Sequence, residues 1–137
     1  MSERTLVLVK PDGVARGLVG EVLGRLERKG YRLVACDMRT LTVETAQAHY
    51  AEHAEKPFFP ELVDFITTGE TLALVLEGEG AIAVVRTTMG ATNPAQSAPG
   101  TIRGDLALSM PDNLVHGSDG SETAAREIGL WFGDELG

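Results

Sequence analysis

The segment RTLVLVKPDG, residues 4–13, decides how the fold begins. Its apolar run from Leu6 to Val9 follows a charged start, which is typical of a strand buried inside a sheet. The Lys-Pro-Asp-Gly sequence that follows interrupts this pattern. We therefore expect a first strand over residues 4–9 that ends at Lys10.

Strand-like and helix-like segments follow along the rest of the chain. Apolar residues recur at helical spacing from Leu18 to Arg28, and Gly30 closes that segment. Thr42 is a candidate N-cap for the next helix. The patterns predict strands over residues 31–40, 71–78 and 113–116, and helices over residues 18–28, 43–53, 58–67, 81–88 and 121–132. Residues 89–104 contain three glycines and two prolines and form a loop long enough to suggest a function.

Apart from the extra short helices, the predicted order is strand, helix, strand, repeated once. This order fits an α+β domain of the ferredoxin-like split-βαβ type, βαββαβ, with a small antiparallel sheet and helices on one face. The length of 137 residues predicts one domain over residues 1–137. The fold class alone decides nothing about chemistry.

Composition and charge narrow the class of protein. Apolar residues make up 43% and charged residues 23%, which excludes a disordered tail, a collagen and a coiled coil. No apolar run approaches the roughly 20 residues of a membrane-spanning helix, and the single cysteine, Cys36, cannot form an internal disulfide. We therefore expect a cytoplasmic protein. The net charge of −8 disfavours nucleic acid as a partner, so an anionic ligand requires basic residues that converge locally.

Two patterns suggest sites that we interpret as structural. Residues 78–83, GEGAIA, match a dinucleotide-binding turn, but Glu79 would place a carboxylate at the pyrophosphate, and the strand before it is the third in the chain. A tight turn is the favoured interpretation. His49 and His53 have the spacing of a metal-binding pair on a helix, but no third ligand is evident, which favours a solvated or partly packed helical face.

The third histidine, His116, lies at the end of a short predicted strand, beside Gly117 and close to Ser118 and Asp119. A histidine in this place is more often structural than catalytic. Arg103, in the glycine-rich loop before it, favours a functional interpretation.

The run NLVHGSDGSETAAREI, residues 113–128, closely resembles the active-site signature N-x-x-H-G-S-D-S of the nucleoside diphosphate kinases. The resemblance extends over essentially the whole chain, through long motifs in the same order. These are TLVLVKPDGV at 5–14, HYAEHAEKPFFPELVDFITTG at 49–69, LEGEGAIAVVRTTMGATNPAQSAPGTIRGD at 76–105 and REIGLWF at 126–132.

The resemblance implies a phosphotransferase that moves the γ-phosphate of a nucleoside triphosphate, typically ATP, to a nucleoside diphosphate and so maintains the nucleotide pools. His116 matches the histidine that carries the phosphate on Nδ1 in a ping-pong reaction. A neutral imidazole has a free lone pair for this attack. Glu127 matches the residue that orients the imidazole, with help from Ser118.

Further roles follow from the same resemblance. Lys10, Arg86 and Arg103 match the phosphate-binding residues. Thr92, Tyr50 and Asn113 match residues that form hydrogen bonds to phosphate, histidine and ribose respectively. Phe58 and Leu62 match the apolar side chains that sandwich the base.

Mg²⁺ is the implied cofactor, held chiefly by the phosphates, with Asp119 holding water around it. The family is commonly hexameric and sometimes tetrameric, so a homo-oligomer is expected, with a hexamer favoured. Gly120 departs from the signature, which usually has a second serine there, and the departure predicts a looser start of the last helix. The competing interpretation is a non-catalytic nucleotide-binding module on the same fold.

Overall fold

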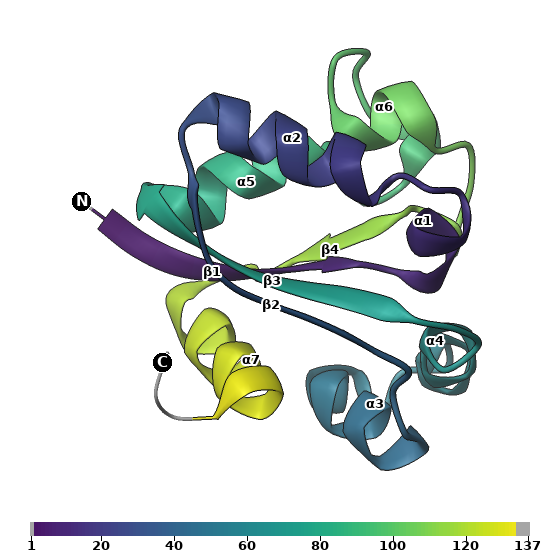
Figure 1. Cartoon of the computed structure of the whole chain (residues 1–137). Helices are drawn as coiled ribbons and strands as arrows, with labels where there is room; N and C mark the ends of the chain where they lie inside the picture. Colours follow the sequence, from purple (N-terminus) through teal and green to yellow (C-terminus); the bar gives the residue numbers. More distant parts are fainter. Residues whose placement is uncertain (1, 134–137) are drawn as a thin grey trace.

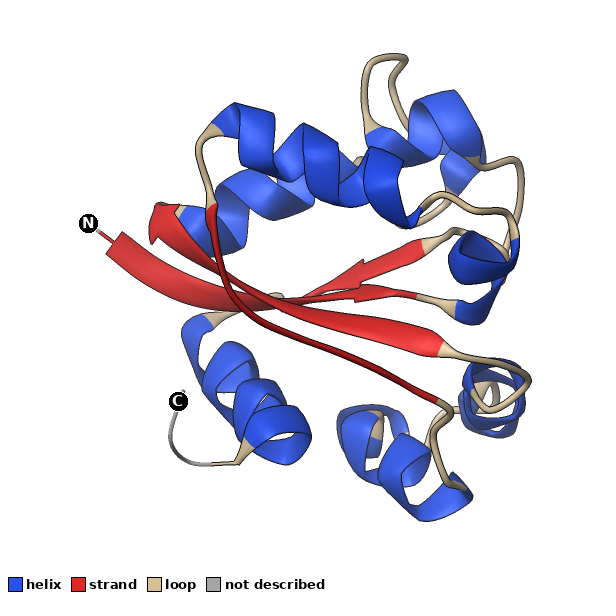
Figure 2. Cartoon of the chain, viewed as in Figure 1, coloured by secondary structure: helices blue, strands red, loops and turns tan. Residues whose placement is uncertain are grey.

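β1 (Ser2–Val9) is an inner strand of the sheet, in a computed structural model that describes residues 2–133. β1 pairs antiparallel with β3 (Thr71–Glu79) on one side and with β4 (Val115–Gly117) on the other. β2 (Arg32–Arg39) pairs antiparallel with β3 and forms an edge. The resulting order β2-β3-β1-β4 is that of the predicted ferredoxin-like split-βαβ fold, which is thereby confirmed (Figures 1 and 2).

Two helices cross one face of the sheet. α2 (Val19–Lys29) connects β1 to β2, and α5 (Ala81–Met89) connects β3 to β4 (Figure 1). The strands in each pair are not neighbours, so each crossover passes over the strand between them. Val7 and Val9 of β1 point to this face, where they pack with Leu26 and Val85.

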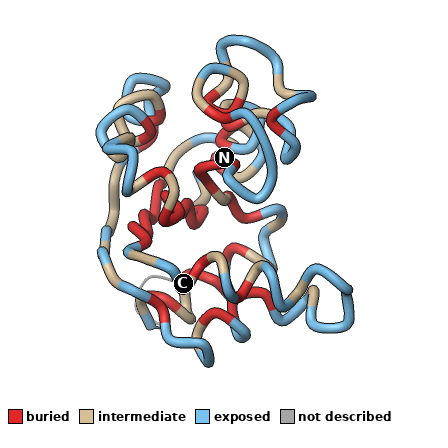
Figure 3. The backbone as a smooth tube through the Cα atoms, turned by 90° about the vertical axis from the view of Figure 1, so that its right-hand side faces the viewer, coloured by how far each residue is buried: buried red, intermediate tan, exposed pale blue. Residues whose placement is uncertain are grey.

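The opposite face of the sheet is also covered, which corrects the prediction of helices on one face. α3 (Val43–His49), α4 (Phe59–Ile66) and α7 (Ser121–Phe132) lie there (Figure 1). Leu6 and Leu8 of β1 pack against Ile66 and Trp131 in this layer. Because successive side chains of a strand point to opposite faces, the continuous apolar run of β1 supplies both cores. Figure 3 shows the buried residues gathered in the middle of the molecule.

Several short helices lie where the sequence predicted a break or a loop. Pro11–Ala15 form α1, in which Pro11 occupies the first turn, where proline is well tolerated. The predicted helix over 43–53 is divided into α3 and the 3₁₀ turn η1 (Ala51–His53). The predicted loop over 89–104 contains η2 (Pro94–Gln96) and the start of α6 (Ile102–Leu106). In residues 2–133, none of the helices has the length and apolar character needed to cross a membrane.

Candidate active site

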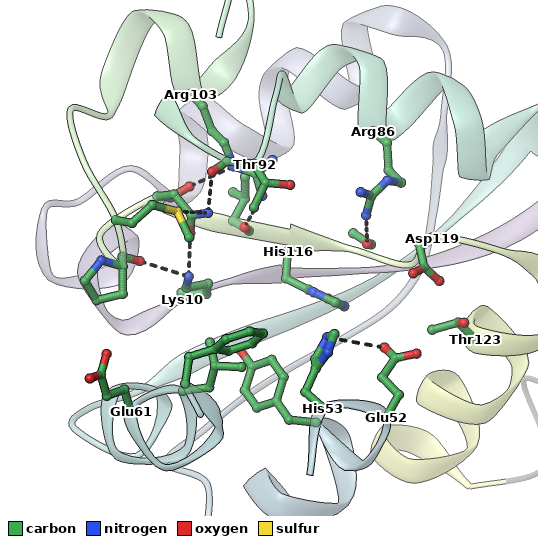
Figure 4. Close-up of a pocket in the computed structure, with 18 residues that line it drawn as sticks. Lys10, Glu52, His53, Glu61, Arg86, Thr92, Arg103, His116, Asp119 and Thr123 are labelled. Carbon is green, nitrogen blue, oxygen red and sulfur yellow. Dashed lines mark hydrogen bonds and ion pairs between the residues drawn. The ribbon is translucent and has the colours of Figure 1, made fainter. Parts of the chain in front are cut away.

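A pocket of about 500 Å³ lies beside β4, lined on one side by Arg86 of α5 and Arg103 of α6 and on the other by residues of η1 and α4. Ten of the twelve side chains predicted for the site line it, and the other two, Ser118 and Glu127, are buried. The ten are Lys10, Tyr50, Phe58, Leu62, Arg86, Thr92, Arg103, Asn113, His116 and Asp119. In Figure 4, Lys10, Arg86 and Arg103 lie around one part of the pocket, across from the helical segments that carry His53 and Glu61.

The pairing of β4 with β1 determines where His116 points. His116 is opposite Leu8, and side chains of directly paired residues share one face of a sheet. Leu8 belongs to the core under α3, α4 and α7, so His116 points into that layer, at the wall of the pocket. Val115 faces the other core, beneath α2 and α5.

Glu127, on the buried side of α7, holds the inner edge of the His116 ring. The Nε2 atom of His116 lies 3.1 Å and 3.2 Å from the two carboxylate oxygens of Glu127. Ser118 donates from Oγ to Glu127 Oε1 over 2.7 Å. Ser118 itself is fixed, because its backbone N–H donates to the carbonyl of Leu6 in β1.

The electrostatics of this group select one tautomer of His116. Burial raises the pKa of Glu127, but the hydrogen bond and charge of His116 and the hydrogen bond from Ser118 outweigh burial and hold that pKa below its ordinary value. An ionised carboxylate only accepts hydrogen bonds, so Nε2 of His116 must carry the proton. The lone pair of the neutral ring is therefore on Nδ1.

Lys10 is a buried cation at the end of β1. Its Nζ donates to Asn113 Oδ1 over 2.5 Å and to the carbonyl of Pro111 over 3.1 Å. Burial, the largest effect, and the neighbouring charge of Arg103 lower the pKa of Lys10 to about 8, against the opposing charges of Asp12 and Asp112. Asn113 uses its amide nitrogen to donate to the carbonyl of Thr92, so both ends of its amide already bind protein.

Arg103 lines the pocket and also braces the backbone around it. It donates to the carbonyls of Asn113, Gly90 and Val115 over 3.2, 3.0 and 2.7 Å. A guanidinium has five N–H donors, so two remain for a ligand. Burial is the main cause that lowers the pKa of Arg103 to about 10, with a contribution from Arg86.

Arg86, on α5, is the third cation and is more exposed than the other two. It donates to the carbonyl of Gly117 over 2.8 Å, directly beside His116. Three positively charged side chains from three segments thus converge on one pocket in a chain of net charge −8.

Two local backbone features position these groups. Leu114 has the left-handed conformation, φ 69°, which is costly for a branched side chain and typical of functional sites. Asp12 stabilises it by accepting from the N–H of Leu114 over 2.9 Å. In the Arg103 turn, any Cβ on Gly104 would lie 1.9 Å from the carbonyl oxygen of Ala98, so only glycine fits.

The opposite wall of the pocket is apolar. Phe58 is 45% exposed although it is aromatic, and Leu62 and Met110 line the same pocket. The Phe58 ring lies 5.6 Å from the ring of His53. Together these three side chains give this wall an apolar surface.

The structure also bears on residues 78–83, GEGAIA, which match a dinucleotide-binding turn in the sequence. The first turn of α5 is occupied by a side chain, because Glu3 Oε1 accepts from the N–H of Ile82 over 2.9 Å. Any Cβ on Gly78 would lie 2.6 Å from the Tyr31 ring, so Gly78 serves close packing. Both observations support the tight turn over a dinucleotide site.

His49 and His53 do not face each other as a metal-binding pair would. His49 is buried against Glu127 and Trp131, and His53 lies in η1 at the pocket, so His49 is fully packed and not on the solvated or partly packed helical face that we expected. Sequence reasoning also missed Glu52, Glu61 and Met110 in the pocket wall. The available signal was their closeness in the chain to Tyr50, Leu62 and Asn113, which were expected at the site.

Comparison with known proteins agrees with this geometry. The sequence model described as nucleoside diphosphate kinase matches residues 3–136. The chain belongs to the nucleoside diphosphate kinase family. This confirms the predicted family and its class of enzyme, a phosphotransferase that acts on nucleotides.

Curated relatives and solved structures of the nucleoside diphosphate kinase family resemble the chain over almost its full length. A nucleoside diphosphate kinase of Archaeoglobus fulgidus is 62% identical over 97% of this chain and 88% of that protein. One of Rubrobacter xylanophilus is 63% identical over 96% of this chain and 98% of that protein. The crystal structure of a nucleoside diphosphate kinase family protein from Babesia bovis has a TM-score of 0.93 and 48% identity, with 98% of this chain and 90% of that chain covered. The apo structure of the Encephalitozoon cuniculi enzyme has a TM-score of 0.96 and 39% identity, with 98% and 92% covered.

Proposed function

We propose that the chain, as one domain over residues 1–137, transfers the γ-phosphate of a nucleoside triphosphate to a nucleoside diphosphate through a phosphohistidine on Nδ1 of His116. The observation that carries the proposal is the contact of His116 Nε2 with the buried carboxylate of Glu127. This contact fixes the proton on Nε2 and leaves the Nδ1 lone pair as the nucleophile.

The reaction divides into two displacements that use one site. In the first, Nδ1 of His116 forms a bond to the γ-phosphorus while the bond from that phosphorus to the β–γ bridging oxygen breaks, and the nucleoside diphosphate leaves. In the second, a terminal oxygen of another nucleoside diphosphate attacks the same phosphorus and the N–P bond breaks. The ring retains its Nε2 proton throughout, and Glu127 stabilises the positive charge that the ring gains.

Lys10, Arg86 and Arg103 bind and orient the phosphates in this proposal. Phosphoryl transfer asks a protein mainly for positioning and for neutralisation of charge. The three cations line the pocket together with His116, and the Thr92 hydroxyl is an additional donor to phosphate. In the same scheme Tyr50 forms a hydrogen bond to the histidine, and Asn113 binds the ribose through the second lone pair of its Oδ1, which already accepts from Lys10.

Phe58 and Leu62 hold the base. An apolar surface accepts purines and pyrimidines alike, because every base has a face that can stack. The exposure of Phe58 at 45% leaves its ring available for such a contact. Broad tolerance of the base follows.

Mg²⁺ fits the donor set of the pocket, because the carboxylates of Asp119, Glu52 and Glu61 line it and magnesium prefers oxygen ligands. We propose that the Asp119 carboxylate contacts the metal ion through a bound water molecule. When bound, the ion would screen the negative charge of the phosphates.

The remaining parts of the proposal concern assembly and location. We infer a cytoplasmic homo-oligomer, hexameric in preference to tetrameric, with nucleotides and not nucleic acid as partners. The net charge of −8 supports the exclusion of nucleic acid.

Steady-state kinetics test the proposed reaction. Initial rates of phosphate transfer from ATP to GDP, measured over a grid of both concentrations, are expected to give parallel double-reciprocal lines. Intersecting lines would mean a ternary complex and would contradict the phosphohistidine route. Nucleotide binding without transfer would favour the non-catalytic module.

A further inference from the structure

We propose that His49 is a positioning residue for the phosphotransfer: its ring and its Nε2–H hold the carboxylate of Glu127, and through it the ring of His116, in the reactive orientation. This inference rests on the proposed function and assigns a role to a buried group that the reaction scheme does not use. His49 is the last residue of α3 and is 1% exposed.

The hydrogen bond on one side of His49 determines its tautomer. Trp131 Nε1, on α7, lies 3.4 Å from His49 Nδ1 and points its N–H at that atom. An indole nitrogen only donates, so Nδ1 of His49 must accept, and the proton of the neutral ring is on Nε2. Burial, followed by the charge of His116, lowers the pKa of His49 to about 3, which keeps the ring neutral.

The other side of His49 faces the carboxylate of Glu127. The Nε2 atom of His49 is buried without a hydrogen-bond partner among residues 2–133 and lies 4.0 Å from Glu127 Oε2. A buried donor without a partner is costly, and a shift of about 1 Å would complete this hydrogen bond. The donor therefore lies beside the group that orients the proposed nucleophile.

The two oxygens of Glu127 have unequal support. Oε1 accepts the 2.7 Å hydrogen bond from Ser118. Within the described part of the chain, the one hydrogen-bonding contact of Oε2 is that shared with His116 at 3.2 Å, and His49 Nε2 and Arg126 Nη2 lie further away, at 4.0 and 3.9 Å. As positive charge develops on His116, both oxygens need donors, and His49 is the neutral donor placed beside Oε2.

Contacts through the ring and the backbone fix His49 in this place. Its ring packs edge-on against the His116 ring, with centroids 4.8 Å apart and planes at 72°. Arg126 donates to the carbonyls of Ala48 and His49, which joins the end of α3 to α7. The position of His49 is thus tied to the helix that carries Glu127.

The same cluster offers three ligand atoms for a metal ion, within 4.8 Å of one another. Such an ion would take the lone pair of His116 Nε2 and so move the proton of that ring to Nδ1. The proposed reaction needs the opposite tautomer. The positioning role is therefore the one compatible with transfer at this histidine.

The test compares His49→Phe, which keeps an aromatic ring but removes the donor, with His49→Gln, which keeps an N–H in the side chain. Val75→Ala is the matched control, because Val75 is buried in the same core but does not line the pocket.

Rapid-quench measurements give the rate of phosphohistidine formation at saturating ATP, and titration gives nucleotide affinity. We expect His49→Phe to slow phosphorylation about tenfold, as loss of an orienting hydrogen bond does at comparable sites, with affinity changed less than twofold. His49→Gln should recover most of the rate, and Val75→Ala should lower the melting temperature without slowing phosphorylation.

Nitrogen NMR of the wild-type protein supplies a measurement that depends on no variant. It should find His49 neutral with its proton on Nε2 at pH 7. A charged His49, the Nδ1–H tautomer, or a wild-type rate in His49→Phe would each overturn the proposal. Absence of phosphohistidine in the wild type would overturn the proposed function as well, which separates the two failures.

Discussion

The two faces of the sheet use burial in different ways. Under α2 and α5, the core cluster consists of apolar side chains such as Val7, Leu26 and Val85. Under α3, α4 and α7, apolar packing surrounds two titratable groups, His49 and Glu127, that are 1% and 0% exposed. Both layers are built on alternate residues of the same strand, β1.

This difference separates the residues that stabilise the fold from the residues that support phosphate transfer. Apolar burial stabilises a fold without directional requirements, whereas a buried carboxylate is tolerated only with hydrogen-bond donors around it. Ser118 and His116 bind Glu127 in this way, and His49 Nε2 lies 4.0 Å from its Oε2. Substitutions of apolar core residues under α2 and α5 should therefore change stability, and substitutions around Glu127 should change transfer.

The largest expected effect is on the functional face, in His116→Ala. Loss of the nucleophile should reduce phosphate transfer by at least about 10⁴-fold, because no other side chain in this scheme replaces Nδ1. The protein should remain folded, because His116 lies at the pocket, but the free energy of unfolding should fall by about 1–3 kcal/mol because the buried carboxylate of Glu127 loses one of its donors. Coupled exchange assays and chemical denaturation measure both quantities, and near-normal turnover would remove His116 from its proposed role.

The converse substitution is Leu26→Ala, on the other face. Leu26 is fully buried in the core beneath α2, so the cavity should cost about 3 kcal/mol in the free energy of unfolding. The kcat of the folded fraction should stay close to that of the wild type. A large loss of kcat with intact folding would show that the two faces are not separable.

The charge of Lys10 depends on pH, and we expect this dependence to change the KM for nucleotide by less than the two substitutions above change transfer and stability. Its folded-state pKa of about 8 lies below the ordinary 10.5, so the side chain loses its charge as pH rises through 8. The KM for nucleotide should rise about tenfold between pH 7.5 and 9.5, since a charge-assisted hydrogen bond to phosphate is lost.

The same pKa shift has a consequence for stability. Between pH 8 and 10.5 the unfolded chain binds more protons at Lys10 than the folded chain, so this residue's contribution to stability rises with pH.

In Lys10→Arg, the KM should remain flat from pH 7.5 to 9.5. A wild-type KM that does not change over this range would mean that Lys10 does not bind phosphate.

The smallest expected effect concerns the start of α7. Gly120 is the N-cap residue, its φ of −166° suits any residue, and a Cβ there would meet nothing within 4 Å. Gly120→Ser should therefore stabilise the protein by about 0.5 kcal/mol, through a capping hydrogen bond and a less flexible unfolded chain. Thermal unfolding measures the gain, and a lower melting temperature would show that the glycine is required.

The sequence predicted the strands and the crossover order because periodicity is a local signal, and the resemblance to the family supplied the residues that line the pocket. It did not predict that α3, α4 and α7 cover the second face of the sheet. The apolar run from Leu6 to Val9 does not by itself show whether helices cover one face of the strand or both. α1 was missed because proline and glycine near Lys10 indicate a break as readily as a first helical turn.

Site residues were least accessible to sequence reasoning where their role depends on long-range contacts. His49 lies 67 positions before His116 in the chain, and only the packing of α3 against α7 brings both to Glu127. The backbone contacts of Arg103 were likewise invisible, because they join its side chain to Gly90 and Val115.

The most direct test of the account is to incubate the protein with γ-labelled ATP and magnesium, to treat samples with acid and base, and to chase with GDP. The account predicts label on the protein that is lost in acid, stable in base, absent in His116→Ala and transferred to GDP. Folded protein that binds nucleotide but carries no such label would contradict the phosphohistidine mechanism.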